Sequence, residues 1–167
     1  MYIPTYWLKL YTEETWQEFL NNARGEISGF HESRWSIVQQ VRPGDYLICY
    51  LTGVSRLIGI LEVVSEAFED STPIWKNEVF PCRLKVKPVI RLTPETGVPI
   101  KHLRDQLTIF ENRNNPRAWI GHVRASPAKW ETSDGEVIVA ALKEAQKNPV
   151  IRPLTKRRET SKSQSST

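Results

Sequence analysis

Alternating apolar and polar positions at the start of the chain predict a strand over residues 2–11, YIPTYWLKLY. Side chains two positions apart lie on the same face of a strand. The last six positions therefore divide between two faces, with Trp7, Lys9 and Tyr11 on one and Tyr6, Leu8 and Leu10 on the other.

Residues 12–25, TEETWQEFLNNARG, have the pattern of a helix. Thr12 is a favourable N-cap, the two glutamates after it suit the positive end of the helix dipole, and Gly25 supplies a stop. Trp16, Phe19 and Leu20 form the apolar stripe, so Trp16 is predicted to be a core residue.

Residues 26–33, EISGFHES, are predicted to form a loop. Ser33 would then cap a short helix over residues 34–41, RWSIVQQV, which Pro43 and Gly44 close. The side of this helix that faces the core is predicted to carry Trp35, Ile37 and Val38.

Two apolar segments, residues 45–52 and 56–65, predict an antiparallel hairpin because only a short GVS turn separates them. Residues 78–92 predict a further strand with two different faces. Leu84, Val86 and Val89 are assigned to one face, and Arg83, Lys85 and Lys87 to the other. The basic face is either a solvated strand surface or a surface that contacts phosphate.

Residues 69–81, EDSTPIWKNEVFP, place a tryptophan within a segment of turn-forming residues. Asp70, Thr72 and the prolines favour turns, and apolar strands lie on either side. Ile74 and Trp75 are therefore predicted to lie on a connection, at an opening in the fold. The alternative is that Trp75 covers one end of the core.

The last third of the chain predicts a turn and short helix over 93–107, a polar loop over 109–119, and a helix over 133–149. Ser133 or Asp134 would cap this last helix, and Asn148–Pro149 would end it. Three to six strands, joined by hairpins and interleaved with short helices, predict an α+β fold. Its mixed, mostly antiparallel sheet is expected to curl into an open barrel with flanking short helices.

The composition is that of a folded domain, with 40% apolar and 25% charged residues in 167 positions. No apolar run approaches the roughly 20 residues that span a bilayer, and no signal peptide opens the chain. We therefore expect a cytoplasmic protein without membrane contact, monomeric as an isolated domain. Cys49 and Cys82 lie in strand-like patterns and are predicted to be buried free thiols. Trp119 and Trp130 are expected to anchor the last helix.

The net charge of +4 is concentrated at the end of the chain. Residues 152–167 hold five of the 23 basic residues and one of the 19 acidic residues, which leaves 18 of each sign in 1–151. This segment lacks aromatic residues and is rich in Ser, Thr and charge. We predict one domain over 1–151 and a disordered basic tail or linker over 152–167. The tail is a linker to a further domain, an arm that contacts phosphates, or an inert terminus.

Motifs for catalysis and for cofactors are absent from the sequence. His31, His102 and His122 are widely spaced and share no metal-ligand pattern with the cysteines or acids. No glycine-rich phosphate loop is present, and Ser55 lacks the context of a nucleophile elbow. The protein is therefore predicted to be non-enzymatic, without a metal or a cofactor.

The order of these segments resembles that of the EVE domain, a family of the PUA-like superfamily related to YTH domains. Three stretches carry the resemblance: Arg34–Trp35 followed by Gly44–Asp45 and a tyrosine-ended strand, the GILEVV strand with its acidic exit, and Phe80 to Pro88. The resemblance covers residues 4–110 well and 111–150 in outline.

The resemblance implies a reader that takes a flipped, often methylated base into a pocket and stacks it against aromatic residues. In the related YTH layout, one pocket wall follows the first helix and another follows the third strand, while the end of the first strand, Tyr11 through Thr15 here, edges the same opening. The positions implied here are Trp75, Phe30, Ser28, Gly29, Ile74, Tyr11, Thr12 and Thr72. Phe30 replaces a tryptophan of the YTH pattern and the asparagines near Tyr11 are missing. A modified pyrimidine is therefore expected at least as much as N6-methyladenine.

Local basic residues would have to contact the phosphates, because residues 1–151 are neutral overall. The expected contacts are Arg34, Arg83, Lys85, Lys87, Arg113 and Arg117. The leading expectation is recognition of modified cytosine in DNA by a targeting module of a restriction or defence system, with a fused or separate motor or nuclease. Two alternatives stay open: a PUA-like module that reads modified RNA, including N6-methyladenine, and a domain that binds a small molecule or protein in the same cavity.

Overall fold

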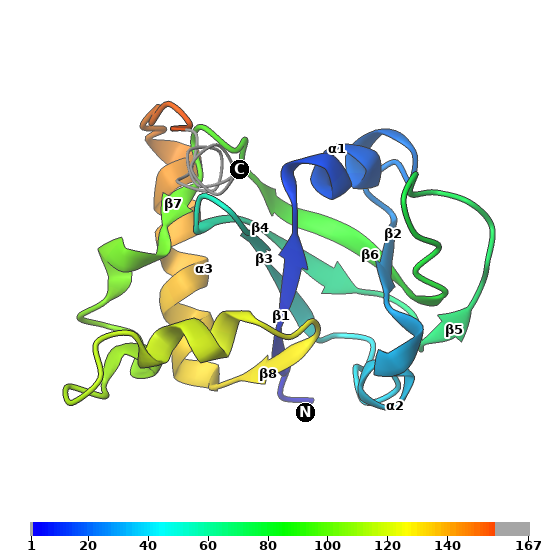
Figure 1. Ribbon diagram of the computed structural model, residues 1–167, viewed down its shortest axis with the longest axis horizontal. Coiled ribbons are helices and arrows are strands. Elements are labelled where there is room, and N and C mark those ends of the chain that lie inside the picture. Colours follow the sequence, from blue (N-terminus) through cyan, green and yellow to red (C-terminus); the bar gives the residue numbers. More distant parts are fainter. Residues whose placement is uncertain (1, 156–167) are drawn as a thin grey trace, which may run out of the picture.

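A curled mixed sheet with helices at its ends and along one face forms the body of the protein (Figure 1). The computed structural model describes residues 2–155. Its strands are β1 (Tyr6–Tyr11), β2 (Ile27–Phe30), β3 (Tyr46–Leu51), β4 (Arg56–Val63), β5 (Phe68–Glu69), β6 (Cys82–Arg91), β7 (Val98–Pro99) and β8 (Ala128–Trp130). Its α-helices are α1 (Glu13–Asn21), α2 (Trp35–Val38) and α3 (Thr132–Lys147), and its 3-10 helices are η1 (Glu32–Arg34), η2 (Ile100–Leu103), η3 (Thr108–Phe110) and η4 (Ala118–Val123).

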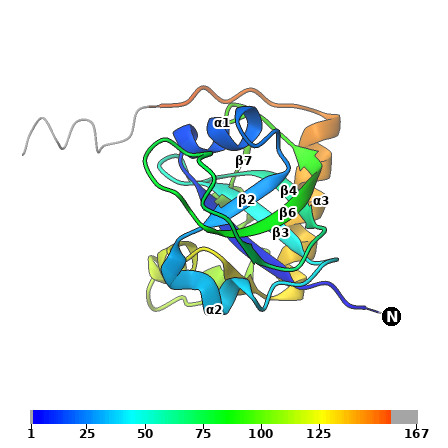
Figure 2. The same ribbon diagram turned by 90° about the vertical axis from the view of Figure 1, so that its right-hand side faces the viewer.

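The strand order is β2-β6-β4-β3-β1-β8, with β5 paired to β6 and β7 paired to β4. β1 and β3 are parallel, with Tyr6 opposite Tyr46, and the other described pairs are antiparallel. The sheet curls so that β2 comes back toward β1, as the side view shows (Figure 2). The predicted class, an α+β fold with a mostly antiparallel sheet in an open barrel, is confirmed. The eight described strands exceed the predicted three to six because β5, β7 and β8 are only two or three residues long.

The two faces of β1 pack into two different cores. Trp7 and Tyr11 belong to the core inside the curl, with Trp16 and Phe19 of α1. Leu8 belongs to the core on the outer face, which α3 covers together with the segment over 100–123. The predicted division of β1 into two faces is therefore confirmed. Trp16 is fully buried as predicted, and Trp119 and Trp130 pack in the outer core with residues of α3.

The N-terminal cap of α1 is the one that the sequence predicts. Thr12 Oγ1 accepts a hydrogen bond from Thr15 N at 3.0 Å, and Thr15 Oγ1 accepts one from Thr12 N at 2.9 Å. Beyond the helix, Gly25 has φ +70°, a left-handed conformation that suits glycine. The Thr12 cap at the N-terminus of α1 fixes the direction of the chain directly after the end of β1.

The prediction of a loop over 26–33 is wrong, because Ile27–Phe30 forms β2. Ser28 and Gly29 have the composition of a turn, but their backbone pairs with β6, where they lie opposite Leu84 and Arg83. The predicted Ser33 cap is also wrong. His31 Nδ1 accepts from Ser33 N at 3.0 Å, so His31 caps η1 instead.

Two further details of the prediction are wrong for local reasons. Val89 is exposed and Ile90 is buried, because the β4–β6 register shifts between Ile60 and Leu61 and leaves Val89 without a partner in β4. Helix α3 has Glu131 at its N-cap, with no side-chain cap bond. The Asp134 carboxylate is buried and accepts from Thr108 N at 2.8 Å and from Thr108 Oγ1 at 2.6 Å.

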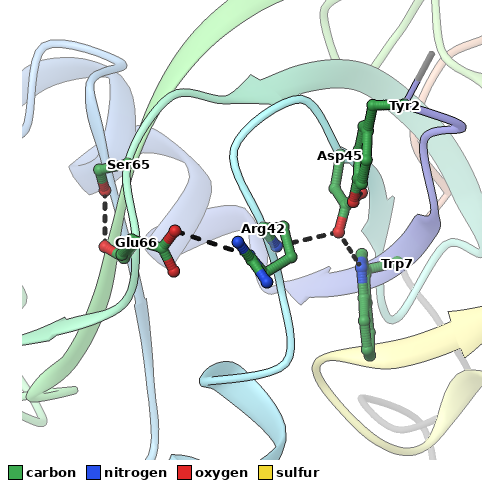
Figure 3. Close-up of polar contacts among 6 residues, drawn as sticks. All are labelled: Tyr2, Trp7, Arg42, Asp45, Ser65 and Glu66. Atoms are coloured by element: carbon green, nitrogen blue, oxygen red, sulfur yellow. Dashed lines mark hydrogen bonds and ion pairs between the residues drawn. The ribbon is translucent and has the colours of Figure 1, made fainter.

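Asp45 joins the N-terminal segment to the start of β3 (Figure 3). Its buried carboxylate accepts hydrogen bonds from the Tyr2 hydroxyl, Thr5 N at 2.9 Å, Trp7 Nε1 at 3.0 Å and Arg42 N at 2.9 Å. The Tyr2–Asp45 hydrogen bond and partial burial raise the pKa of Tyr2 to about 12. The Gly44–Asp45 pair, which is part of the resemblance to the EVE domain, is therefore structural, because Asp45 orients Trp7 inside the curl.

The first residues of the predicted tail contact the domain. Arg56 Nη1 donates to the Arg152 carbonyl at 2.6 Å, and Arg152 N donates to the Glu95 carbonyl at 2.8 Å. The rest of the tail, residues 156–167, lies outside the described residues. Within residues 2–155, no helix is long and apolar enough to cross a membrane.

Candidate functional site

A cavity of about 200 Å³ lies where β2 returns to β1. It is smaller than the roughly 300–1,000 Å³ of pockets for drug-sized ligands, which suits a single ring system. Four of its nine lining residues are aromatic, and they come from both strands and from the connection 70–81. The lining residues are Lys9, Leu10, Tyr11, Thr15, Gly29, Phe30, Trp75, Phe80 and Ser126.

Trp75 lies on the 70–81 connection, as predicted, and forms one wall of the cavity. Its side chain is 7% exposed, so the indole is packed on one side rather than free in solvent. The Phe80 ring meets it edge-on, with ring centroids 5.3 Å apart. A Cβ atom on Gly29 would lie 2.5 Å from the indole, so only glycine at this point of β2 lets Trp75 lie where it does.

Arg83 holds the connection in place from behind the wall. Its guanidinium donates to the carbonyls of Phe80 at 3.1 Å, Thr72 at 2.6 Å and Val79 at 3.1 Å. It also lies 3.7 Å from the Asp70 carboxylate and 5.3 Å from the Trp75 ring centroid. Arg83 is 1% exposed, so it stabilises the loop that carries Trp75, and we do not propose it as a phosphate contact.

Helix α1 holds the other end of the same connection. Asn22 Nδ2 donates to the Ile74 carbonyl at 2.9 Å, and Lys76 N donates to Glu18 Oε2 at 2.9 Å. Asn77 Nδ2 donates to a second α1 side chain, Glu14 Oε1, also at 2.9 Å, while Asn22 is the C-cap residue that follows the helix. Trp75 is therefore fixed on both sides before any ligand arrives, which lowers the entropy cost of binding.

Lys9 is the charged residue of the cavity wall. It lies between Trp7 and Tyr11 on the inner face of β1 and is 7% exposed. Its ammonium donates to the Gly29 carbonyl at 2.5 Å and lies 4.2 Å from the Phe30 ring centroid. Burial lowers the pKa of Lys9 to about 7.

Four of the eight predicted pocket residues, Tyr11, Gly29, Phe30 and Trp75, line the cavity together. The other four lie near it without lining it. Ser28 is fully buried with its Oγ 3.5 Å from the Tyr11 hydroxyl, Thr12 caps α1, Ile74 packs against the inner core, and Thr72 is exposed with its carbonyl bound by Arg83.

The sequence prediction did not name Lys9, Leu10, Phe80 or Ser126 as pocket residues. For Lys9 a signal existed, because a lysine that alternates with Trp7 and Tyr11 on one strand face points toward a core. Phe80 had a weaker signal as an aromatic residue in the same connection as Trp75. Ser126 lies far away in sequence, and only the fold brings it to the cavity.

The other predicted phosphate contacts have different surroundings. Lys85, Lys87, Arg113 and Arg117 are exposed. Arg34 Nη2 donates to the Pro127 carbonyl at 2.8 Å, next to Ser126 at the cavity. Arg113 and Arg117 line a broad groove of about 900 Å³. The other charged side chains of this groove are Lys101, Arg104, Asp105 and Glu111.

Comparisons with known proteins agree with this architecture. The family model of the EVE domain matches residues 5–141. A UPF0310 protein of Pyrococcus abyssi is 30% identical, over 71% of this chain and 85% of that relative. Among solved structures, the Pho92 YTH domain in complex with m6A has a TM-score of 0.63 at 17% identity, covering 89% of this chain and 88% of that one. The Mmi1 YTH domain in complex with RNA has a TM-score of 0.61 at 12% identity, covering 90% and 85%.

Proposed function

The chain belongs to the EVE domain family, and from that premise we propose that it is a non-enzymatic reader of modified bases in nucleic acid. The base is a modified cytosine, flipped out of DNA into the cavity beside Trp75. One observation carries the proposal: a preformed cavity of about 200 Å³ walled by Tyr11, Phe30, Trp75 and Phe80. Its size and its aromatic wall fit one flat ring.

The energetics of such a site are balanced between gain and cost. Stacking a base on an aromatic face contributes about 1–3 kcal/mol, against a few kcal/mol for unstacking and flipping it. A buried methyl group adds about 0.8 kcal/mol, which is only about fourfold in affinity. Selectivity for the modification therefore also needs shape and hydrogen bonds that disfavour the unmodified base. Ser126 Oγ lies at the cavity wall and accepts from Leu10 N at 3.0 Å, so its hydroxyl can still donate to a base, whereas Thr15 Oγ1 is engaged in the cap of α1.

The similar structures support binding rather than catalysis as the role of the fold. The Pho92 YTH domain was solved with m6A, and the Mmi1 YTH domain was solved with RNA. Both cover most of this chain. A cavity that reads a base in this chain would use the fold in the same general way.

The nucleic-acid backbone would be held by exposed basic residues of β6 and of the groove that Arg113 and Arg117 line. We propose Lys85, Lys87, Arg113 and Arg117 as phosphate contacts, since their side chains are exposed. Arg34 would act at the rim, where it already binds the loop that carries Ser126. The cellular role that we propose is a targeting module in a restriction or defence system, with a fused or separate motor or nuclease.

The RNA complexes of the YTH neighbours favour a second candidate, a module that reads modified RNA. One titration separates the candidates: labelled duplex DNA with and without 5-methylcytosine, and the matched RNA with and without the same modification. Tighter binding to modified DNA supports the first function, and tighter binding to modified RNA supports the second. Indifference to both would contradict base reading and favour a small-molecule or protein ligand.

A further inference from the structure

Lys9 is a buried cation without a carboxylate partner in the described part of the chain. Its side chain is 7% exposed, and none of the ion pairs found within residues 2–155 involves it. Lysine is rarely buried so deeply unless it is paired, because removing its charge from water is costly. A strand position between Trp7 and Tyr11 would accept an apolar side chain without this cost.

The surroundings of the ammonium leave part of its hydrogen-bonding capacity open. Among residues 2–155, the Gly29 carbonyl is the acceptor found for Nζ, and an ammonium group carries three N–H donors. The rings of Phe30, Tyr11 and Phe80 surround it, with centroids at 4.2, 5.0 and 5.8 Å. Aromatic faces stabilise a cation but accept hydrogen bonds only weakly. The remaining donors therefore need an oxygen or nitrogen acceptor that enters the cavity.

The ammonium also determines which ligands the aromatic wall can take. An aromatic cage without a charge attracts cations, but here a cation of the protein already lies against three of the rings. A second cation would be repelled at this distance. A ring that presents an oxygen acceptor would instead gain a charge-assisted hydrogen bond.

We propose that Lys9 is the donor that reads the inserted base, and that it restricts the cavity to bases that present an exocyclic carbonyl oxygen. This inference rests on the proposed base-reading function and narrows its substrate class. A cytosine ring offers the ammonium two adjacent acceptors, a carbonyl oxygen and a ring nitrogen, and uracil offers carbonyl oxygens, whereas adenine offers single ring nitrogens and no exocyclic oxygen. Lys9 therefore favours modified pyrimidines over N6-methyladenine.

The charge state of Lys9 gives this proposal a pH signature. Its lowered pKa leaves it partly neutral near pH 7, and an acceptor in the cavity would draw the proton back. The other titratable groups around it are Tyr11, Cys49 of β3 and, behind Trp75, Arg83. Burial raises the pKa of Tyr11 and Cys49, so both stay neutral from pH 6 to 8, while arginine stays charged. Among these four groups, Lys9 is the one expected to titrate between pH 6 and pH 8.

The test measures binding of the full chain to two labelled DNA duplexes, one with 5-methylcytosine and one with N6-methyladenine, at pH 6 and pH 8. The wild type should prefer the 5-methylcytosine duplex by at least about tenfold. Its affinity should fall about tenfold from pH 6 to pH 8, as a group with a pKa near 7 loses its proton. Lys9→Met should bind that duplex about 10- to 100-fold more weakly, with no pH dependence. Lys143→Met, which removes one exposed charge from α3, should behave as wild type.

Each alternative outcome has a definite meaning. Unchanged affinity and pH dependence in a folded Lys9→Met variant would overturn the role of Lys9 and leave base reading intact. Equal wild-type binding of the two duplexes would overturn the restriction to carbonyl-bearing bases. If the wild type binds neither duplex nor the RNA equivalents, the base-reading function fails, and this inference fails with it. If Lys9→Met does not fold, the wild-type preference between the two duplexes still tests the restriction to carbonyl-bearing bases.

Discussion

The indole of Trp75 packs so closely on Gly29 that a Cβ atom at that position would lie 2.5 Å from its Cη2. Two segments that are 46 positions apart thus share one contact at the cavity wall. The glycine is needed for close approach rather than for backbone freedom, since Gly29 lies within β2. The most direct test of the cavity therefore changes the smallest residue in it.

Gly29→Ala should displace Trp75 and weaken base-dependent binding about 5- to 150-fold, which corresponds to the loss of about 1–3 kcal/mol of stacking. Overpacking should also lower the free energy of unfolding by about 1–3 kcal/mol. Gly121→Ala is the matched control, because a Cβ atom there meets nothing within 4 Å. Binding titrations and urea unfolding of both variants check this. Wild-type binding by Gly29→Ala would show that the position of Trp75 is not required.

Trp75→Leu should lose base-dependent binding by a similar factor, because leucine fills space but offers no aromatic face. Trp75→Phe should retain part of the binding. Since Trp75 is only 7% exposed and packs against Phe80, its removal also costs stability, contrary to what a loop position alone suggests. Trp130→Phe, a change in the outer core, separates the loss of stability from the loss of base stacking. Equal binding loss in Trp130→Phe would mean that stability, not stacking, controls affinity.

Lys9 should make the folded state more stable as the pH rises above neutrality. Burial lowers its folded-state pKa to about 7, whereas an unfolded lysine has a pKa of about 10.4. Between these values the unfolded chain binds more protons, so the free energy of unfolding should rise by about 2 kcal/mol from pH 7 to pH 9. Lys9→Met should be more stable than wild type at pH 7 and lack this rise, which Lys143→Met should keep. Urea unfolding at several pH values measures this rise in the free energy of unfolding. If the rise persists in Lys9→Met, a group other than Lys9 causes it.

Asp45→Asn should destabilise the fold by about 2–4 kcal/mol. The carboxylate accepts hydrogen bonds from Tyr2, Thr5, Trp7 and Arg42 (Figure 3). The NH2 group of asparagine cannot accept them and would itself face hydrogen-bond donors. Asp105→Asn, at an exposed position, should change stability by less than about 0.5 kcal/mol. Chemical unfolding of the two variants provides the comparison. Similar values for both would show that the hydrogen bonds of Asp45 contribute little.

Removing residues 156–167 should weaken binding to modified and unmodified DNA by the same factor. The cut keeps Arg152 and Pro153, whose carbonyls bind Arg56. It removes four basic residues and one acid, so the slope of log affinity against log salt should become shallower by about 0.9 for each phosphate released. Binding titrations at several salt concentrations measure this slope. A lower ratio of modified to unmodified binding would mean that the tail helps to read the base.

The sequence alone determined the features that depend on near neighbours. Alternation placed Trp7, Lys9 and Tyr11 on one face of β1, and capping chemistry placed the start of α1 at Thr12. Turn-forming residues placed Trp75 on a connection. Strand periodicity, cap preference and turn chemistry are local effects that a short segment expresses without the rest of the chain. The family resemblance, rather than these local effects, implied the eight cavity positions, of which Tyr11, Gly29, Phe30 and Trp75 line the cavity.

Only the tertiary structure decided which residues far apart in sequence meet. Ile27–Phe30 becomes a strand because β6 supplies its hydrogen-bond partners, although its own composition favours a turn. Arg83 alternates with two exposed lysines, yet three carbonyls of the 70–81 connection surround it and bury it. Lys9 belongs to the cavity because the sheet curls until β2 reaches β1. These positions depend on long-range backbone pairing and on the burial of charge, and neither is encoded in the pattern of a single segment.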